Sequence, residues 1–275
     1  MRKIVLLLIL SISIVNCASD ENSNDGNNQN EFVGDVILKF QQDVDDFALN
    51  NYTIVTGRFQ IGQTQATTNS ITNISNLIDL TTINGHLLLT GNSSLTSLNG
   101  LNNITSVLGT LSVHKNNNLT NLSGLNNINS VGNLQVDGNE NLVNISDLSN
   151  IASVNGYLQA NYIFIEKNPK LTNLNGLDNI TTFNGSLNIE HNDLFENLNG
   201  LNGITTIKSL VIACNNMLTN LDGLNNINSD TGNIIDNTSL TDLCGIQTIA
   251  TSGFVIYGNA YNPSTQDFID GNCSQ

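Results

Sequence analysis

Three carboxylates occupy equivalent positions in a repeated segment, where they could do chemistry together. Asp137, Glu166 and Glu190 each end a short segment in which apolar and polar residues alternate. If these segments stack as neighbouring strands, the carboxylates lie about 4.8 Å apart and form an acidic row. That spacing raises one pKa of the group and suits a retaining glycosidase pair or a cation site. Because Lys115 and Lys167 are adjacent and the row would face water, we expect a solvated acidic stripe, with cation binding and catalysis as alternatives.

Apolar and aromatic residues at the neighbouring outward position indicate a second kind of site. Leu88, Phe164 and Val211 are apolar where contact with solvent is expected. The repeat that contains Phe164 is about five residues longer than its neighbours, and it adds Tyr157 and Tyr162. Exposed aromatic and apolar side chains mark interaction surfaces. We therefore predict a ligand-binding patch made of these five residues. The alternative is that the insertion folds over the sheet and buries itself.

The other candidate residues for catalysis or metal binding have simpler structural explanations. Cys214 and His191 fall in the same column of adjacent repeats, but a zinc site needs three or four ligands, so we expect a partly buried free thiol. His86 and His114 fall, like His191, at polar positions and are expected to be exposed. The aspartates between residues 43 and 46 lie in a predicted helix, where acidic residues favour the positive end. No nucleophile elbow, phosphate loop, H-E-x-x-H or C-x-x-C motif occurs. The sequence therefore predicts a protein that is not an enzyme and that uses no metal or cofactor.

The element that positions these residues is a repeat of about 23 residues. The phrase L-T-x-L-x-G-L-x-x-I recurs with starts near Ile71, Leu95, Leu119, Leu142, Leu171, Phe195, Leu218 and Leu240. Each unit then contains a short strand with two inward apolar residues. One unit cannot bury its apolar edge alone, whereas stacked units can. We predict an all-β-dominated fold, a right-handed parallel β-solenoid of about nine rungs like those of leucine-rich repeats, in which the rung that ends near Asn237 is short and irregular.

Asparagine is the most unusual feature of the composition, with 51 of 275 residues. One Asn recurs after each strand, from Asn92 to Asn259. Its amide both donates and accepts hydrogen bonds, so we expect these residues to turn inward and pair from rung to rung as a ladder. Further Asn residues precede Gly, as at Asn84-Gly85 and Asn99-Gly100, where we expect positive φ angles at the corners.

Both ends of the stack need caps. At the start we expect a strand at 35–38 and a helix at 41–50, which places Val44, Phe47 and Ala48 on one face. At the end, Asn262-Pro263 should open a short helix with Pro at its first position. Cys244 and Cys273 both lie in the terminal cap, and in an oxidising compartment we expect them to form a disulfide.

The N-terminal segment has the pattern of a signal peptide for export. Arg2 and Lys3 precede an apolar run that ends at Cys17, and the run is too short to span a bilayer. This arrangement resembles a bacterial lipoprotein signal, which implies cleavage before Cys17 and lipidation of its thiol. Asn16, where a small residue is usual, departs from that pattern, so ordinary signal cleavage is the competitor. The domains expected are a signal peptide at 1–16, a disordered tether at 17–34 and the solenoid at 35–275.

The acidic net charge limits the kinds of partner that the protein is expected to bind. The formal net charge is -15, with 8 basic and 23 acidic residues. A nucleic-acid binder needs a basic surface, so no nucleic acid is expected as a partner. The residue after the lipidated cysteine is Ala18 rather than Asp, and an acidic Ser-Asp-Glu follows. Both features resemble surface lipoproteins, which implies the outer membrane, with a lipid anchor and a face towards the cell exterior.

The repeat and its caps resemble the receptor L domain, a leucine-rich-repeat-like β-solenoid of receptor ectodomains. The features that carry the resemblance are the opening G-D-V-I-L strand, the L-x-G-L-x-x-I units and the closing Asn262-Pro263 and Asn272-Cys273. The resemblance implies a binding or adhesion protein that recognises a protein, peptide or glycan ligand through the strand-bearing face. The alternatives are a solenoid carbohydrate-active enzyme that uses the acidic row, and a structural component of a surface coat.

Overall fold

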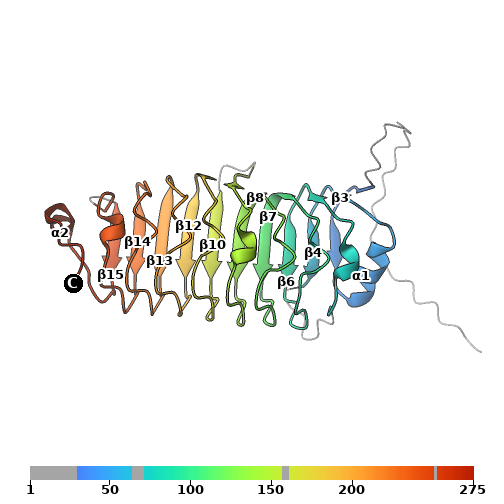
Figure 1. Cartoon of the computed structure of the whole chain (residues 1–275), viewed down its shortest axis with the longest axis horizontal. Coiled ribbons are helices and arrows are strands. Elements are labelled where there is room, and N and C mark those ends of the chain that lie inside the picture. Colours follow the sequence, from blue (N-terminus) through green and yellow to red (C-terminus); the bar gives the residue numbers. More distant parts are fainter. Residues whose placement is uncertain (1–29, 64–70, 157–160, 251–252) are drawn as a thin grey trace, which may run out of the picture.

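The protein is an elongated parallel β-solenoid of about nine turns in this computed structural model (Figure 1). The structure describes residues 30–63, 71–156, 161–250 and 253–275. The predicted signal peptide, Cys17, most of the predicted tether and Tyr157 lie outside these ranges. No helix among the described residues is long and apolar enough to cross a membrane.

One long row of parallel strands runs along the whole stack. Each strand pairs with its neighbours without a gap, and the equivalent residues of successive repeats lie opposite one another, as at Phe164↔Gln135 and Phe164↔Asn188. The strands in order are β2 (Val36–Leu38), β4 (Phe59–Gly62), β6 (Leu87–Thr90), β7 (Ser106–His114), β8 (Ser130–Asp137), β10 (Tyr162–Glu166), β12 (Ser186–Glu190), β13 (Ser209–Ala213), β14 (Gly232–Ile235) and β15 (Phe254–Tyr257). The rung before Asn237 is short as predicted, since β14 has four residues where β12 and β13 have five, but it is not irregular, because β14 pairs in unbroken register with both neighbours.

A second, shorter row covers the first two thirds of the stack. Its strands are β1 (Glu31–Phe32), β3 (Ile54–Val55), β5 (Thr82–Ile83), the first residues of β7 and β8, β9 (Ser153–Val154) and β11 (Thr182–Phe183). Loops with three short 3-10 helices complete the turns: η1 (Ser75–Leu77), η2 (Ser146–Leu148) and η3 (Cys244–Ile246). The chain therefore goes round a narrow apolar interior once per repeat.

The apolar residues of the repeat fill this interior. Within one unit Leu95, Leu98, Leu101 and Ile104 are buried completely or almost completely, and so are the two inward residues of the strand that follows. Burial of a Leu or Ile side chain contributes about 1.5–3 kcal/mol. Because every unit supplies the same set, the core is one continuous apolar rod.

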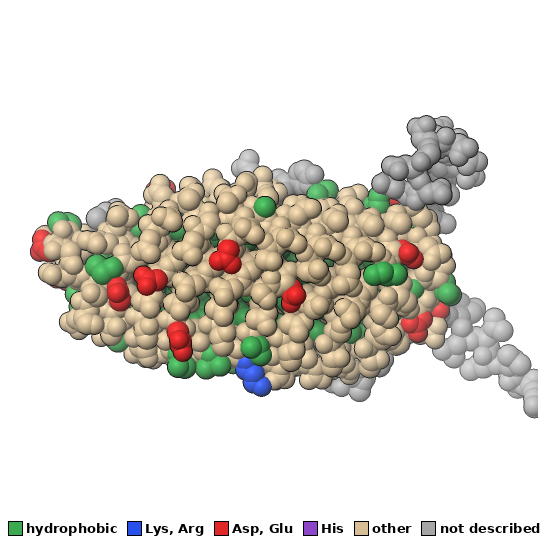
Figure 2. Space-filling view, in the orientation of Figure 1, with side chains coloured by type: hydrophobic (Ala, Val, Ile, Leu, Met, Phe, Trp, Pro, Cys, Tyr) green, Lys and Arg blue, Asp and Glu red, His purple; other side chains and the backbone are tan. Residues whose placement is uncertain are grey.

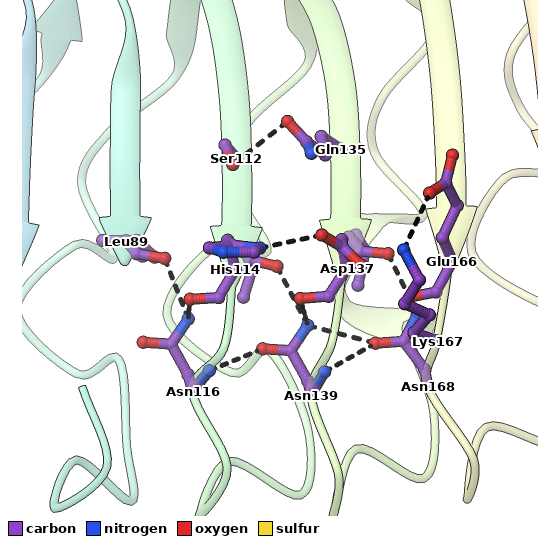
Figure 3. A network of polar contacts seen from close by, with 12 residues as sticks. Leu89, Ser112, His114, Asn116, Gln135, Asp137, Asn139, Glu166, Lys167 and Asn168 are labelled. Carbon is purple, nitrogen blue, oxygen red and sulfur yellow. Dashed lines mark hydrogen bonds and ion pairs between the residues drawn. The ribbon is translucent and has the colours of Figure 1, made fainter. Parts of the chain in front are cut away.

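The predicted asparagine ladder is confirmed. Asn139 is fully buried, and its Nδ2 donates to Asn168 Oδ1 of the next rung at 3.1 Å and to the carbonyl of Val113 in the preceding rung at 2.9 Å. Its Oδ1 accepts the backbone N–H of Asn116 at 2.9 Å (Figure 3). The same pattern continues through Asn192, Asn215, Asn237 and Asn259. Each ladder side chain thus links three rungs.

The Asn-Gly corners follow the prediction only in part. Gly100 has φ 115°, a conformation that only glycine adopts without strain. Gly85 does not have a positive φ, so that prediction was wrong at this corner. There the physical reason for glycine is space, because a Cβ on Gly85 would collide with the backbone of Gly57 in the rung below.

The two ends are closed in different ways. Helix α1 (Gln41–Ala48) covers the first rung, and its Val44 is buried. Helix α2 (Thr265–Asp270) begins after the N-cap Ser264, so Pro263 lies before the cap and not at the first helical position as predicted. Ser264 is the N-cap because its hydroxyl accepts the backbone N–H of Asp267 at 3.2 Å, whereas a proline side chain has no acceptor. The predicted disulfide between Cys244 and Cys273 is present and ties the tail to η3.

Candidate functional site

The strand-bearing face presents three outward rows of side chains. The middle row contains Gln60, Leu88, Ser112, Gln135, Phe164, Asn188, Val211, Asn233 and Val255, each opposite the next in the strand register. Because neighbouring strands are about 4.8 Å apart, the number of strands between two residues of this row gives the distance between them along the stack. Whether two predicted site residues lie close together therefore depends on the row and the strand that each occupies.

Tyr162 and Phe164 of β10 form a stacked aromatic pair. Their ring centroids are 4.3 Å apart and their planes differ by 26°. The hydroxyl of Tyr162 lies 3.3 Å from that of Thr110 on β7, two strands away, and the Tyr162 N–H donates to Asn133 Oδ1 at 2.9 Å. The Tyr162 ring therefore lies along the sheet and does not stand away from it.

The polar residues next to the pair are buried, which is unusual for an outward face. Thr110, Ser112 and Asn133 are each less than a tenth exposed, whereas both aromatic residues remain half-buried. The rings thus present a rigid apolar surface to solvent above a polar layer that fixes their position. Aromatic rings that are partly open to solvent and held in one geometry lose little conformational entropy when a ligand covers them.

The other predicted patch residues do not join the pair. Leu88 lies three strands from Phe164, about 14 Å along the row, and Val211 lies two strands away, about 10 Å. Both are half-buried, and polar side chains separate them from the aromatic residues. The patch predicted from sequence is therefore an aromatic centre with two detached apolar positions, and Tyr157 lies outside the described residues.

The acidic row forms as predicted, because Glu166 pairs with Asp137 on one side and with Glu190 on the other. At Asp137 the expectation of a solvated carboxylate was wrong. Its Oδ2 lies 2.8 Å from His114 Nδ1, and the side chain is 13% exposed (Figure 3). Among the described residues, its buried Oδ1 has no hydrogen-bond partner.

This pairing also corrects the expectation for one histidine. His114 is partly buried, whereas His86 and His191 are exposed as predicted. The signal was present in the sequence, because His114 and Asp137 occupy the same position of adjacent repeats. The hydrogen bond from His114, followed by its charge and those of nearby lysines, holds the pKa of Asp137 below its ordinary value despite burial.

Glu166 is shifted in the opposite direction. Burial raises its pKa, and the charge of Glu190 raises it further. The Nζ of Lys167 lies 3.8 Å from the carboxylate of Glu166 and offsets this only in part. The row therefore holds two neighbouring carboxylates with pKa values moved apart, one low at Asp137 and one raised at Glu166.

A column of left-handed residues follows the acidic row, and sequence reasoning did not identify its conformation. Lys115, Lys167, His191 and Cys214 have φ between 53° and 56°, at the turn between each strand and its ladder Asn. The predicted shared column of Cys214 and His191 is confirmed, and Cys214 is a half-buried free thiol. Burial raises the pKa of this thiol, and the charges of nearby carboxylates raise it further, so the thiol stays protonated at neutral pH.

Neither a metal cluster nor a deep cleft accompanies these residues. Among the described residues, no group of three or more His, Cys, Asp or Glu side chains is placed to hold a metal ion. A shallow hollow of about 280 Å³ is lined by loop residues between 172 and 199 and by none of the predicted ligand residues. The face drawn in Figure 2 has few charged side chains, and most of these are Asp or Glu.

One comparison with known proteins gives a match. The family model of the receptor L domain matches residues 80–178, a region that runs from before β6 to beyond β10 and includes the aromatic pair. Searches of curated proteins and of solved structures found no match. The similarity supports a ligand-binding surface in general and does not name a ligand.

Proposed function

We propose that this chain is a lipid-anchored binding protein of the outer membrane, facing the cell exterior, that recognises a protein, peptide or glycan through the strand-bearing face. The observation that carries the proposal is the Tyr162–Phe164 pair, a fixed and half-buried aromatic surface on a polar face. Tyrosine and other aromatic anchors dominate the energetics of recognition. The match to the receptor L domain covers this pair and supports ligand binding.

Binding, and not turnover, is the activity proposed. The low-pKa carboxylate, Asp137, is engaged by His114 and little exposed, and Glu166 is flanked by Lys167. In this arrangement the acidic row borders the aromatic pair on the same strand and gives the surface a negative rim.

The test of the site is a screen of glycan and protein arrays with the purified protein, followed by substitution. Replacement of both Tyr162 and Phe164 by Ala should weaken any ligand found by at least about 30-fold, the equivalent of about 2 kcal/mol. Met217→Ala is the matched control, because Met217 is 45% exposed but lies in a loop. Unchanged affinity in the double variant would show that the ligand binds elsewhere.

The test of the anchor is separate. Metabolic labelling with a radioactive fatty acid should mark the chain, and Cys17→Ser should abolish the label and release the protein from the membrane fraction. A wild-type chain without label would overturn the lipid anchor, and label that survives the substitution would overturn Cys17 as its position; neither result affects the ligand-binding site.

The second candidate function is a carbohydrate-active enzyme. The observation that favours it is the pair of neighbouring carboxylates with separated pKa values, Asp137 and Glu166, which is the arrangement of a general acid beside an ionised partner. The triple variant Asp137→Asn, Glu166→Gln, Glu190→Gln distinguishes the two functions. Lost turnover of a glycan with retained binding would establish the enzyme, and a wild-type protein without turnover of any bound glycan would exclude it.

A further inference from the structure

The last strand of the stack leaves one edge open. β15 pairs with β14 on one side, and no other described strand pairs with it. The carbonyls of Gly253 and Tyr257 accept N–H groups from β14 and its flanks, so both residues face that strand. Because alternate residues of a strand point to opposite edges, the N–H and C=O groups of Phe254 and Ile256 point away from the stack. The edge therefore offers main-chain donors and acceptors to another strand.

Apolar side chains flank this edge on both faces. Val255 and Tyr257 face outward and are 49% and 53% exposed. Phe254 and Ile256 face inward but remain half-buried, whereas Ile234 in the rung before is fully buried. A strand added here would cover apolar surface on both faces of β15.

Helix α2 and the tail cover this end only in part. Phe268 of α2 is buried, and its carbonyl accepts from the Gln247 side chain. The N–H of Leu243 donates to the carbonyl of Cys273, which the disulfide also holds. These contacts hold α2 and the tail against residues 243–247, on the loop side of the end, and Figure 1 shows α2 beyond the last turn. The apolar side chains of β15 stay accessible beside them.

The opposite end of the stack shows how an edge is protected. β2 is followed at once by α1, whose Val44 is buried against the first rung. Asp35 beside β2 forms an ion pair with Arg58 at 3.1 Å. Covering helices and charges are usual devices by which proteins prevent edge pairing. The four residues of β15 carry no charge, so this edge remains available for a further strand.

The charge around the open edge has one sign. From residue 209 onward the chain has six Asp and no Lys, Arg or His. Two of these, Asp267 and Asp270, belong to α2, which lies beyond β15 (Figure 1). An acidic field repels another copy of the same acidic end and attracts a partner of opposite charge. Charge complementarity therefore selects a basic occupant for the edge.

One of these carboxylates lies at the edge itself. Asp236 directly follows β14, and its N–H donates to the Tyr257 carbonyl at 3.0 Å. A Cβ on Gly258 would collide with Oδ1 of Asp236, so this carboxylate lies beside the glycine that follows β15. Asp236 is exposed, and none of the ion pairs among the described residues includes it. A strand added about 4.8 Å beyond β15 would bring a Lys or Arg side chain within reach of this carboxylate.

The stack already contains contacts of this kind between neighbouring turns. His114 at the end of β7 lies 2.8 Å from the carboxylate of Asp137 at the end of β8. Lys115 and Lys167 occupy, in earlier turns, the left-handed position that Asp236 occupies after β14, and all three donate their N–H to the next turn. This position therefore changes from basic to acidic along the stack, and at the last turns no basic side chain of the chain itself follows.

We propose that the β15 edge binds an extended, basic segment of another protein, which adds to the sheet as a further strand. Main-chain hydrogen bonds to Phe254 and Ile256 provide affinity that does not depend on sequence. Apolar side chains of the segment cover Val255 and Tyr257, and a Lys or Arg pairs with Asp236. The partner is thus recognised by alternation of apolar and basic residues.

The first experiment measures the binding of synthetic peptides to the full chain in detergent by isothermal titration calorimetry. A blocked ten-residue peptide in which Lys and Val alternate should bind with a micromolar Kd. The same peptide with Glu in place of Lys should not bind. A peptide of unchanged charge with Pro in place of two central Val residues should bind at least about tenfold more weakly, because proline lacks the N–H that a strand donates. No binding of the alternating peptide, or equal binding of either matched peptide, overturns the proposal.

The second experiment reverses one charge. Asp236→Lys should weaken binding of the Lys–Val peptide at least about tenfold, because attraction becomes repulsion. The fold accepts Lys at this position, since Lys115 and Lys167 have the same left-handed φ in earlier turns. Asp222→Lys is the matched control, because Asp222 is exposed in a turn of the same acidic end and the net charge changes equally. Equal loss of affinity in both variants would show attraction by net charge alone and would overturn the proposed edge.

The third experiment locates the bound peptide by hydrogen exchange. The N–H groups of Phe254 and Ile256 should exchange more slowly in the complex, whereas exchange in β12 should not change. Protection of β10 in place of β15 would assign the peptide to the Tyr162–Phe164 pair, four strands and about 19 Å away, and would overturn the edge without affecting the proposed ligand site. A dimer that forms without peptide and shows the same protection of β15 would make a second copy the occupant and would also overturn the proposal.

Discussion

The asparagine ladder gives the sharpest prediction of stability. Asn139→Ala removes one buried side chain from the middle of the stack. It leaves the carbonyl of Val113 and the N–H of Asn116 without their partners, and Asn168 Oδ1 loses one of its two donors. A buried polar group that loses its partner costs about 1–3 kcal/mol. Two such groups give an expected loss of about 2–6 kcal/mol in the free energy of unfolding.

Urea unfolding followed by circular dichroism measures this loss. With a slope of about 3 kcal/mol per molar urea, the midpoint should fall by about 0.7–2 M. Asn126→Ala is the control, because Asn126 is exposed in a loop, and its midpoint should move by less than about 0.2 M. If the two variants unfold at the same urea concentration, the ladder does not stabilise the stack and the reasoning from its hydrogen bonds is wrong.

Three further predictions concern the turns, the acidic row and the cap. Lys115→Gly should raise the free energy of unfolding by about 0.5–1 kcal/mol, because Lys115 is exposed and has a φ of 54°, which glycine adopts without strain. Lys170→Gly is the control, because Lys170 lies in an exposed turn without a positive φ and should show no such gain. Equal effects of the two substitutions in urea unfolding would contradict this. Glu166 has a pKa that is raised in the folded state, so it favours the native state below its unfolded pKa, and this stability is lost as pH rises through the folded pKa. Glu166→Gln should therefore raise the free energy of unfolding at pH 7 and leave it unchanged at pH 3. A gain at pH 3 alone would refute the sign of this effect. Reduction of the disulfide between Cys244 and Cys273, 29 residues apart, should lower the free energy of unfolding by about 3–4 kcal/mol in the same assay, and an unchanged midpoint would show that the cap holds without it.

Periodicity allowed most of the fold to be predicted. Inward apolar residues, strand positions and ladder asparagines follow from a pattern that returns every 22 to 29 residues, because each rung must bury the same edge. The end caps were harder, since they occur once. The position of Pro263 relative to α2 was wrong because the hydroxyl of Ser264 competes for the cap, and repetition gives no information about that competition.

The candidate site was less predictable than the scaffold. Register placed Asp137, Glu166 and Glu190 in one row, because that depends only on the period. The ion pair with His114 depends on side-chain rotamers and on burial by neighbours. Similarly, strand alternation puts Tyr162 and Phe164 on the same face, but the direction of the Tyr162 ring along the sheet towards Thr110 depends on its rotamer, which the pattern does not determine.

The ladder has a consequence for how such a chain can change in length. Asn116 and Asn139 occupy identical positions, and each bonds to the next in the same way. A deletion of residues 117–139 would remove one whole turn and bring Asn116 opposite Asn168, which restores the ladder hydrogen bonds. Loss or duplication of a single unit in the gene therefore changes the protein by a fixed step of about 4.8 Å. The length of the molecule therefore changes in evolution by whole repeats.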